Sequence, residues 1–226
     1  MIVSFTKGRA PFTFALAALA LAACAFQAPA EGSAEGGAKG ESTIVSDDYL
    51  APGQATAVFA MGCFWCAESD FEKVDGVVDV ISGYTGGSLV DPTYKQVTYE
   101  DTGHYEAVLV TYDTAKLSYD DLLKVFWKNV DPYDARGQFC DKGTSYRAAA
   151  FPASDEEKAA AKKSKMTLEA KLGGKEFATK ILDRTAFYRA EDYHQDYYQK
   201  NPVRYTYYRT ACGRDRRLEA VWSKAD

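Results

Sequence analysis

Hydrophobic and polar positions along the chain change between strand and helix periods after residue 55. The apolar run at residues 57–61 (AVFAM) predicts a short buried strand that ends at Gly62. Beyond Cys63 and as far as Gly76, apolar residues recur at helical spacing, at Phe64, Ala67, Phe71 and Val74. The order of strand, glycine turn and helix therefore places Cys63 at the start of a helix.

Two later segments have the composition of strands. Residues 77–82 (VVDVIS) predict a second strand that leads into a turn-rich stretch at residues 83–92. Residues 105–112 (YEAVLVTY) give the clearest strand, because β-branched and aromatic residues dominate it. Side chains alternate between the faces of a strand, so Glu106 shares a face with Val108. We expect a carboxyl group in such apolar surroundings to stay protonated, because desolvation penalises its charged form.

Capping residues mark two helices in the middle of the chain. Residues 118–121 (SYDD) resemble a capping box, and the helix after them has an apolar side and stops before residues 131–132 (DP). Residues 154–157 (SDEE) open another helix, which ends at residues 173–174 (GG). The second helix consists largely of Lys, Glu and Ala, so we expect it to be a solvated outer helix.

The stretch after Leu182 is dense in tyrosine and shows no long periodic element. We therefore predict an irregular C-terminal tail that packs through its aromatic rings. Strands and helices that follow one another at short intervals predict an α+β domain over residues 55–226. Its expected architecture is a mixed, partly antiparallel sheet flanked by helices, in a two-layer sandwich-like arrangement.

The beginning of the chain has the pattern of an export signal. A basic start with Lys7 and Arg9 precedes an apolar run at residues 12–23, which is too short to span a bilayer comfortably. The run ends in Leu-Ala-Ala-Cys at residues 21–24. These four residues resemble the lipobox of bacterial lipoproteins, in which the cysteine is lipidated and the signal is removed.

We accordingly predict a signal peptide over residues 1–23 and lipidation of Cys24. Residues 24–54 are rich in Ala, Gly, Glu and Ser and cannot bury enough apolar surface to offset the entropy of ordering, so we expect a flexible tether. The predicted location is periplasmic, or on a bacterial membrane as an anchored lipoprotein. A plain secretory signal cut after residues 28–30 (APA) and a retained membrane anchor are the alternatives.

Charge argues against nucleic acid as a partner. Removal of residues 1–23 deletes two bases and no acid, which leaves 25 basic and 32 acidic residues and a net charge of −7. Such a surface repels phosphate, and no basic run offsets it. The two histidines, His104 and His194, are too few and too far apart in sequence to indicate a metal, so we interpret each as a hydrogen-bonded structural residue.

Four cysteines in the domain leave several interpretations open: Cys63, Cys66, Cys140 and Cys212. The cysteines could form two structural disulfides, a zinc site, a thioredoxin-like C-x-x-C pair, or an attacking thiol with separate resolving thiols. The position of Cys63 favours the last, because free N–H groups and the helix dipole at a helix start favour a thiolate. We therefore expect the pKa of Cys63 to be lowered.

The segment GCFWCAE at residues 62–68 resembles the active-site signature of the peptide methionine sulfoxide reductase A family. Further segments continue the resemblance in the family's order: GYTGG at 83–87, DPTY at 91–94, TGHYE at 102–106, DP at 131–132, DKGTSYR at 141–147 and AEDYHQ at 190–195. The resemblance covers roughly residues 56–203. It implies an enzyme that reduces one epimer of methionine sulfoxide, expected to be S, free or in oxidised proteins, without metal or organic cofactor.

The resemblance also implies roles for individual residues. Cys63 is implied to attack the sulfoxide sulfur, and Glu106 to supply the proton that the departing oxygen needs. Tyr94 and Tyr146 are implied to donate hydrogen bonds to that oxygen, where charge develops. Asp141 is implied to orient this polar group.

Phe64 and Trp65 are implied to form the pocket for the methyl group of the substrate, since aromatic surface suits a small apolar substituent and contact with sulfur. A second thiol must then condense with the sulfenic acid. Cys212 matches the place of a resolving cysteine in the family, whereas the commoner family pattern has glycine at Cys66. We rank Cys212 first, Cys66 second and Cys140 third, and a relay through two of them stays open.

A disulfide formed in this way needs an external reductant, so a thioredoxin-like protein is the predicted partner. The alternative function is a non-catalytic redox or zinc-holding module built on the same four cysteines.

Overall fold

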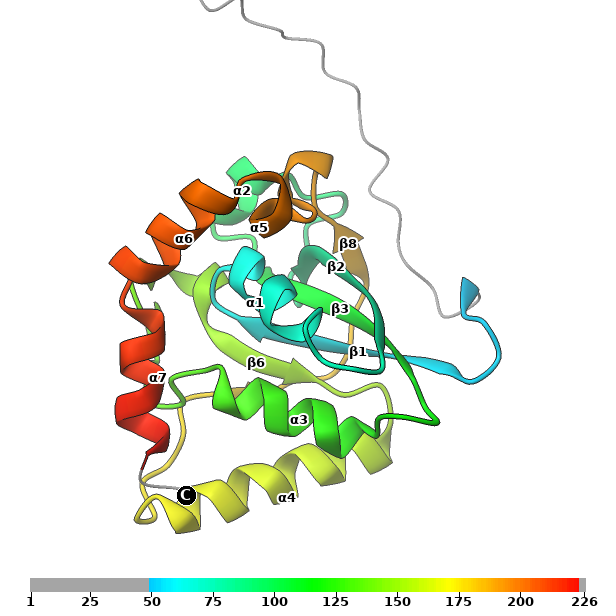
Figure 1. Cartoon of the computed structure of the whole chain (residues 1–226), viewed down its shortest axis with the longest axis vertical. Helices are drawn as coiled ribbons and strands as arrows, with labels where there is room; N and C mark the ends of the chain where they lie inside the picture. The colour runs from blue at the N-terminus through cyan, green and yellow to red at the C-terminus, as the bar shows by residue number, and fades with distance from the viewer. Residues whose placement is uncertain (1–48, 224–226) are drawn as a thin grey trace, which may run out of the picture. The chain divides into compact units, whose positions relative to one another are not determined.

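The computed structural model describes residues 49–223, which fold around one six-stranded sheet (Figure 1). The strands of this sheet are β1 (Gln54–Met61), β2 (Val77–Thr85), β3 (Tyr105–Asp113), β6 (Ala148–Phe151), β7 (Lys180–Ile181) and β8 (Phe187–Arg189). A separate ladder joins β4 (Gly137–Gln138) and β5 (Asp141–Lys142). The helices are α1 (Phe64–Phe71), α2 (Tyr94–Tyr99), α3 (Tyr119–Lys128), α4 (Asp155–Lys171), α5 (Tyr197–Lys200), α6 (Pro202–Ala211) and α7 (Arg214–Trp222).

The six-stranded sheet is mixed, with the strand order β7-β6-β1-β3-β2-β8. β1 runs antiparallel to β3 and β6, β2 runs antiparallel to β3 and β8, and β6 and β7 are parallel. The predicted α+β class and the mixed, partly antiparallel sheet are confirmed.

The main core lies on the face of the sheet against which α1 and α3 pack (Figure 1). Phe59 of β1 stacks between the two helices, with ring centroids 5.3 Å from Phe71 and 5.1 Å from Phe126. Val108 of β3 belongs to the same cluster. Glu106 precedes Val108 by two residues and so points to this face, which carries its carboxyl group into the core beside α1.

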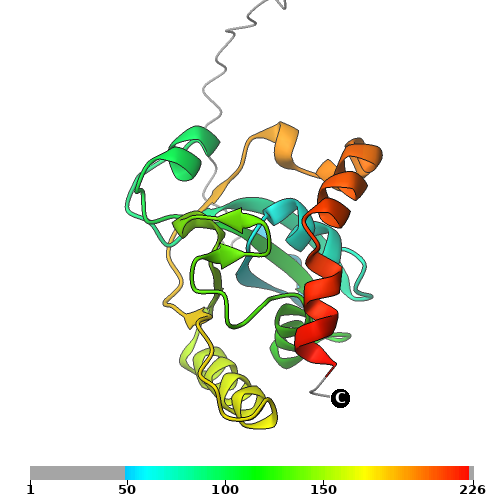
Figure 2. The same ribbon diagram turned by 90° about the vertical axis from the view of Figure 1, so that its left-hand side faces the viewer.

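Helix α4 lies on the outside of the domain, beyond α3, and it stands at one end of the molecule in Figure 2. Ala161 is its buried residue, as we expected for a solvated helix. The Trp127 Nε1–H of α3 donates to Ser164 Oγ of α4 at 2.8 Å, which fastens the two helices together.

The prediction of an irregular C-terminal tail is wrong, because the chain forms α5, α6 and α7 there. Figures 1 and 2 show α6 and α7 following one another along one side of the domain. Pro202 occupies the first turn of α6, where its missing N–H costs little, and Gly213 with a φ of +68° separates α6 from α7. The buried residues are few, Tyr205 in α6 and Arg214, Leu218 and Val221 in α7, so the apolar spacing does not reveal the helices.

Other differences concern shorter elements. Helix α1 ends at Phe71, earlier than predicted, and β2 continues to Thr85 into the stretch expected to be turns. Helix α2 was not predicted, although Thr93 and Gln96 form a complete capping box at its start. Strand β6 was missed because its sequence AAAF carries no β-branched residue.

The predicted signal peptide, Cys24 and most of the predicted tether lie outside the described residues. Within residues 49–223, no helix combines the length and the apolar character that a membrane crossing requires.

Candidate active site

The turn between β1 and α1 presents Cys63 at the edge of the core. Cys63 is the N-cap of α1, as predicted, and its side chain is buried. Gly62 before it has a φ of +81°, and a Cβ atom there would lie 2.6 Å from the Cβ of Gln138. Glycine is therefore required for the turn that sets the thiol in place.

The carboxyl group of Glu106 lies against the start of the same helix. Glu106 is 1% exposed, and its Oε2 accepts the backbone N–H of Phe64 at 3.1 Å. Burial raises the pKa of Glu106 to about 8, although the hydrogen bonds from Phe64 and Tyr146 act in the opposite direction. At neutral pH the group is therefore mainly protonated, which is what its apolar strand face led us to expect.

The expectation of a lowered pKa for Cys63 is wrong. Burial raises the pKa of Cys63 well above its ordinary value, and the hydrogen bond to Cys66 and the nearby carboxyl groups of Glu106 and Asp141 act in the same direction. The start of α1 does little to stabilise a thiolate on Cys63, because the N–H of Phe64 is hydrogen-bonded to Glu106 and the Cys63 side chain makes no capping hydrogen bond. Cys63 is accordingly a neutral thiol at neutral pH.

Tyr94 and Tyr146 bring two hydroxyl groups to the site from separate elements. The hydroxyls are hydrogen-bonded to each other, and that of Tyr146 is also bonded to Glu106. Glu191 holds the start of α2, because its Oε1 accepts the N–H of Tyr94 at 2.9 Å and its Oε2 accepts the hydroxyl of Tyr84 at 2.8 Å. Burial raises the pKa values of Tyr94 and Tyr146, so both remain hydrogen-bond donors.

Phe64, Trp65 and His194 form an aromatic wall beside these hydroxyls. The ring centroids of Phe64 and His194 are 4.9 Å apart, and Trp65 stacks on Tyr197 at 3.6 Å. Trp65 Nε1–H donates to His194 Nδ1 at 3.0 Å, so the neutral imidazole carries its proton on Nε2. Burial lowers the pKa of His194 to about 4, which keeps it neutral. Its hydrogen bond was expected, but its place at the site was not.

His104 lies in a different environment and has the structural role that we predicted. Its Nδ1 accepts the N–H of Gly87 at 3.2 Å, and its Nε2 is 2.8 Å from the carbonyl oxygen of Leu89. The ring therefore fastens residues 87–89, which follow β2, to the start of β3.

Asp141 has a partner that the sequence did not reveal. The hydroxyl of Tyr208, on α6, donates to Oδ2 of Asp141 and is also hydrogen-bonded to Cys63. Burial raises the pKa values of both Asp141 and Tyr208. Tyr208 could not be singled out from sequence, because the helix that carries it has no clear apolar period.

The four cysteines of the domain are divided into two pairs. Cys63 and Cys66 are buried free thiols that are hydrogen-bonded to each other. Cys140 and Cys212 form a disulfide that links the segment before β5 to the end of α6. Cys140 is exposed and Cys212 is half-buried, so the two pairs differ in their access to solvent.

This pairing does not support a four-cysteine zinc site. Within residues 49–223, the cysteine-containing group with metal-ligand spacing is Cys140, Asp141 and Cys212, and its two sulfurs are bonded to each other. Tetrahedral zinc would need four separate ligands around one point.

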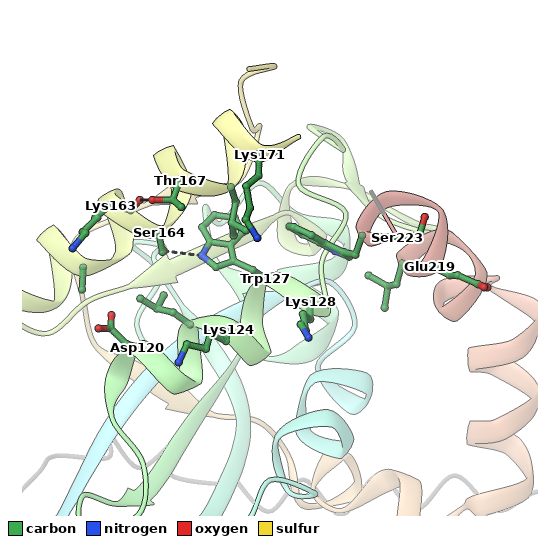
Figure 3. A pocket seen from close by; sticks show the side chains of 15 residues that line it. Asp120, Lys124, Trp127, Lys128, Lys163, Ser164, Thr167, Lys171, Glu219 and Ser223 are labelled. Atoms are coloured by element: carbon green, nitrogen blue, oxygen red, sulfur yellow. Dashed lines mark hydrogen bonds between the residues drawn. The ribbon is translucent and has the colours of Figure 1, made fainter. Parts of the chain in front are cut away.

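A surface pocket of about 680 Å³ lies between α3, α4 and α7, away from the cysteines (Figure 3). Trp127 forms part of its floor, and Lys124, Lys163 and Glu219 are among the charged residues around it. None of its lining residues belongs to the predicted site. The chemistry of the cysteines therefore does not take place in this pocket.

A second buried carboxyl group, Glu68 on α1, makes the stability of the domain depend on pH. Burial raises its pKa from 4.5 to about 8, and its Oε2 has no hydrogen-bond partner among the described residues. A raised carboxyl pKa contributes stability at acidic pH that is lost as the pH rises through about 8. We expect Glu68→Gln to melt several degrees above the wild type near pH 9 and to differ much less near pH 5.

Thermal unfolding at the two pH values tests this expectation, and Glu219→Gln is the control because that side chain is exposed. The expectation is contradicted if the melting temperatures of Glu68→Gln and of the wild type fall by the same amount between about pH 5 and about pH 9.

Comparison with known proteins shows the family to which the chain belongs. A family model described as peptide methionine sulfoxide reductase matches residues 55–226. Peptide methionine sulfoxide reductase MsrA 2 of Caulobacter vibrioides is 53% identical over 172 residues, which cover 76% of this chain and 87% of the relative. MsrA of Bacillus licheniformis is 44% identical over 176 residues, covering 77% of this chain and 97% of that protein.

Solved structures agree. The reduced form of Mxr1 from Saccharomyces cerevisiae superposes with a TM-score of 0.65 at 33% identity, over 71% of this chain and 93% of that one. Methionine sulfoxide reductase A of Corynebacterium diphtheriae superposes with a TM-score of 0.61 at 32% identity, over 68% and 77% of the two chains.

A buried thiol beside a protonated carboxyl group, on this mixed sheet, defines a thiol-dependent oxidoreductase. The family match and the identities show that the chain belongs to the peptide methionine sulfoxide reductase A family. The predictions of the family and of its enzyme class, peptide-methionine (S)-S-oxide reductase, are confirmed.

Proposed function

We propose that the chain reduces the S epimer of methionine sulfoxide, free or in proteins, with Cys63 as the nucleophile and Glu106 as the acid. One observation carries the proposal. A carboxyl group that is protonated at neutral pH accepts the first N–H of the helix that Cys63 caps. The oxygen of a sulfoxide leaves readily only when it is protonated, so the thiol and the acid must act on one substrate group.

Other site residues have roles that fit the same reaction. The hydroxyls of Tyr94 and Tyr146 would donate to the sulfoxide oxygen, on which negative charge develops. Phe64 and Trp65 would supply the apolar surface for the substrate's methyl group. Asp141 would orient the polar group from its hydrogen bond with Tyr208.

The atoms and electrons of the first step balance within the site. The Cys63 sulfur attacks the sulfoxide sulfur and gives up its thiol proton to a base, and the oxygen passes to Cys63 together with the proton of Glu106. Cys63 is oxidised to a sulfenic acid, and the sulfoxide is reduced by two electrons to methionine.

For the second step, the geometry supports an order of resolving thiols that differs from the one predicted from sequence. Cys66 is hydrogen-bonded to Cys63, whereas Cys212, which we had ranked first, is bonded to Cys140. Condensation of Cys66 with the sulfenic acid forms a Cys63–Cys66 disulfide and releases water. Exchange with a reduced Cys140–Cys212 pair then restores the two buried thiols and leaves the outer pair oxidised, which is the redox arrangement in this structure.

A thioredoxin-like protein would complete the cycle by reducing the Cys140–Cys212 disulfide. The exposure of Cys140 supports this role for the outer pair, because an external thiolate must reach a sulfur in order to exchange with it.

Incubation of the full chain with dithiothreitol and either epimer of methionine sulfoxide tests the function. We expect methionine from the S epimer and very little from the R epimer, since a separate enzyme serves each epimer. Failure to form methionine from the S epimer would refute the proposal.

The order of resolving thiols predicts the products of a single turnover. The first test uses a reduced double variant that carries Cys140→Ser and Cys212→Ser. We expect it to form one methionine per chain and to lose two thiols, with no sulfenic acid left for dimedone to trap. The same background with Cys66→Ser should instead give a dimedone adduct on Cys63, which mass spectrometry detects. A stable adduct in the chain that retains Cys66 would show that Cys66 does not resolve.

Export and lipidation at Cys24 are a further part of the proposal, supported by the signal-like pattern of residues 1–24. We expect the full chain to fractionate with bacterial membranes and Cys24→Ser to lose this association. Recovery of both forms in the same soluble fraction would argue against the lipid anchor.

A further inference from the structure

The two thiols of the Cys63–Cys66 pair have different electrostatic surroundings. The carboxyl groups of Asp141 and of Glu106, which is mainly protonated at neutral pH, lie on the Cys63 side. On the other side, Cys66 packs against Tyr205 of α6, whose hydroxyl accepts a hydrogen bond from Arg209 Nη1 at 3.1 Å. Arg214, at the start of α7, is the second positive charge that acts on Cys66. When the pair has lost one of its two protons, the remaining proton is shared in the hydrogen bond between the sulfurs, and the surrounding charges decide which sulfur holds it.

The two arginines near Cys66 lie close together around one carboxylate. Arg209 Nη1 is 2.8 Å and Arg214 Nη2 is 3.5 Å from the carboxylate of Asp70, which lies one turn after Cys66 on α1. Arg209 also pairs with Asp215, but the Asp215 side chain is 66% exposed and its charge is screened by water.

Arg214 is 2% exposed, and it donates to the carbonyl oxygens of Met61 and Asn129. Its Nε has no hydrogen-bond partner among the described residues. One buried and one half-buried guanidinium group thus share the half-buried carboxylate of Asp70, so the positive charge in this part of the domain is incompletely balanced.

The remaining groups around Cys66 do not offset this charge. Tyr205 and Tyr197 pack on it from α6 and α5. Burial raises the pKa of Tyr205 to about 12, so its hydroxyl is neutral. Trp65 and Tyr208 complete the surroundings with aromatic rings.

We propose that Cys66 carries the negative charge of the resting pair and is the base that removes the thiol proton of Cys63 as Cys63 attacks the sulfoxide. This inference rests on the proposed function and assigns a base to it. The Cys63–Cys66 hydrogen bond gives the proton a direct path, and Arg209 and Arg214 act as positioning residues that keep the charge on Cys66.

The electrostatic environment of the two sulfurs agrees with this assignment. The pKa of Cys66 is lowered to about 7, first by its hydrogen bond with Cys63 and then by Arg214 and Arg209, against the effect of burial. The pKa of Cys63 is shifted upward. Glu106 cannot serve as the base, because the same reaction needs it as the acid.

Charge and protons balance through the cycle. The Cys63 proton moves to Cys66, the Glu106 proton moves with the sulfoxide oxygen to Cys63, and both protons leave in the water that forms with the Cys63–Cys66 disulfide. The negative charge passes from Cys66 to Glu106, which then takes a proton from solvent. Cys66 therefore acts first as a base and afterwards as the resolving thiol.

The thiolate absorbance in the ultraviolet locates the charge without any turnover. We would titrate full chains that carry Cys24→Ser and an intact Cys140–Cys212 disulfide between about pH 5 and about pH 9, below the ionisation of ordinary tyrosines. We expect a midpoint near pH 7 in this background, persistence of a thiolate in Cys63→Ser, and its loss in Cys66→Ser. Loss in Cys63→Ser with persistence in Cys66→Ser would overturn the proposal, as would the absence of a thiolate from all three chains.

The rate of the first methionine release tests the role of the base. At neutral pH we expect Cys66→Ser to slow this release by about a hundredfold, the effect of losing a general base. Arg209→Gln should raise the midpoint of the thiolate titration and slow the release, and Arg209→Lys should restore both in large part. Arg217→Gln on α7, which removes a charge paired with Asp131, is the matched control and should change neither.

Two kinds of failure are distinguishable in these measurements. If no chain releases methionine, the proposed function fails. If Cys66→Ser releases its first methionine as fast as the parent chain, only the role of Cys66 as the base fails.

Discussion

Replacement of Cys63 by serine is expected to abolish methionine formation, with a loss of about a thousandfold or more in turnover. A serine hydroxyl is a far weaker nucleophile than sulfur, and it cannot form the sulfenic acid or the disulfide on which the cycle depends. Methionine release from the S sulfoxide with dithiothreitol is the measurement. The loss should already appear in the first turnover, because it affects attack on the substrate.

The control for Cys63→Ser is the double variant that carries both Cys140→Ser and Cys212→Ser, which should still release its first methionine. Near-ultraviolet circular dichroism of Cys63→Ser should match the wild type, because the side chains are close in size. A Cys63→Ser chain that keeps more than about a tenth of the first-turnover rate would exclude Cys63 as the nucleophile.

Replacement of Glu106 by glutamine is expected to lower the rate of the first methionine release by about a hundredfold to ten-thousandfold, the range for loss of a general acid. The amide keeps the shape of the side chain, but it cannot deliver a proton to the leaving oxygen. The wild-type rate should fall as the pH rises through about 8, because the protonated form of Glu106 is lost there. Glu106→Gln should lack this alkaline decrease.

Single-turnover rates across a pH series measure both effects, with Glu100→Gln as the control because Glu100 is exposed. An alkaline limb that persists unchanged in Glu106→Gln would assign the titration to another group.

The local pattern of apolar residues was enough to predict that Cys63 starts a helix and that Glu106 faces the core. The strand, glycine and helix around Cys63 follow from apolar spacing, and the alternation along β3 sets Glu106 on the core face. Both features depend on neighbours within a few residues. The contact between them joins residues 42 positions apart in the chain, and no local pattern encodes it.

The same distant contact explains why the pKa of Cys63 was predicted in the wrong direction. A free N–H at a helix start would have favoured the thiolate, but Glu106 takes the N–H of Phe64. Tyr208, Arg209 and Arg214 were missed for a related reason. They lie on helices with little apolar spacing, and their importance arises from what they contact across the domain.

The hydrogen bond between the Phe64 N–H and Glu106 also has a consequence for how the site responds to thermal motion. Because the carboxyl group is hydrogen-bonded to the backbone immediately after Cys63, a shift of the start of α1 that keeps this bond moves the proton source and the sulfur together.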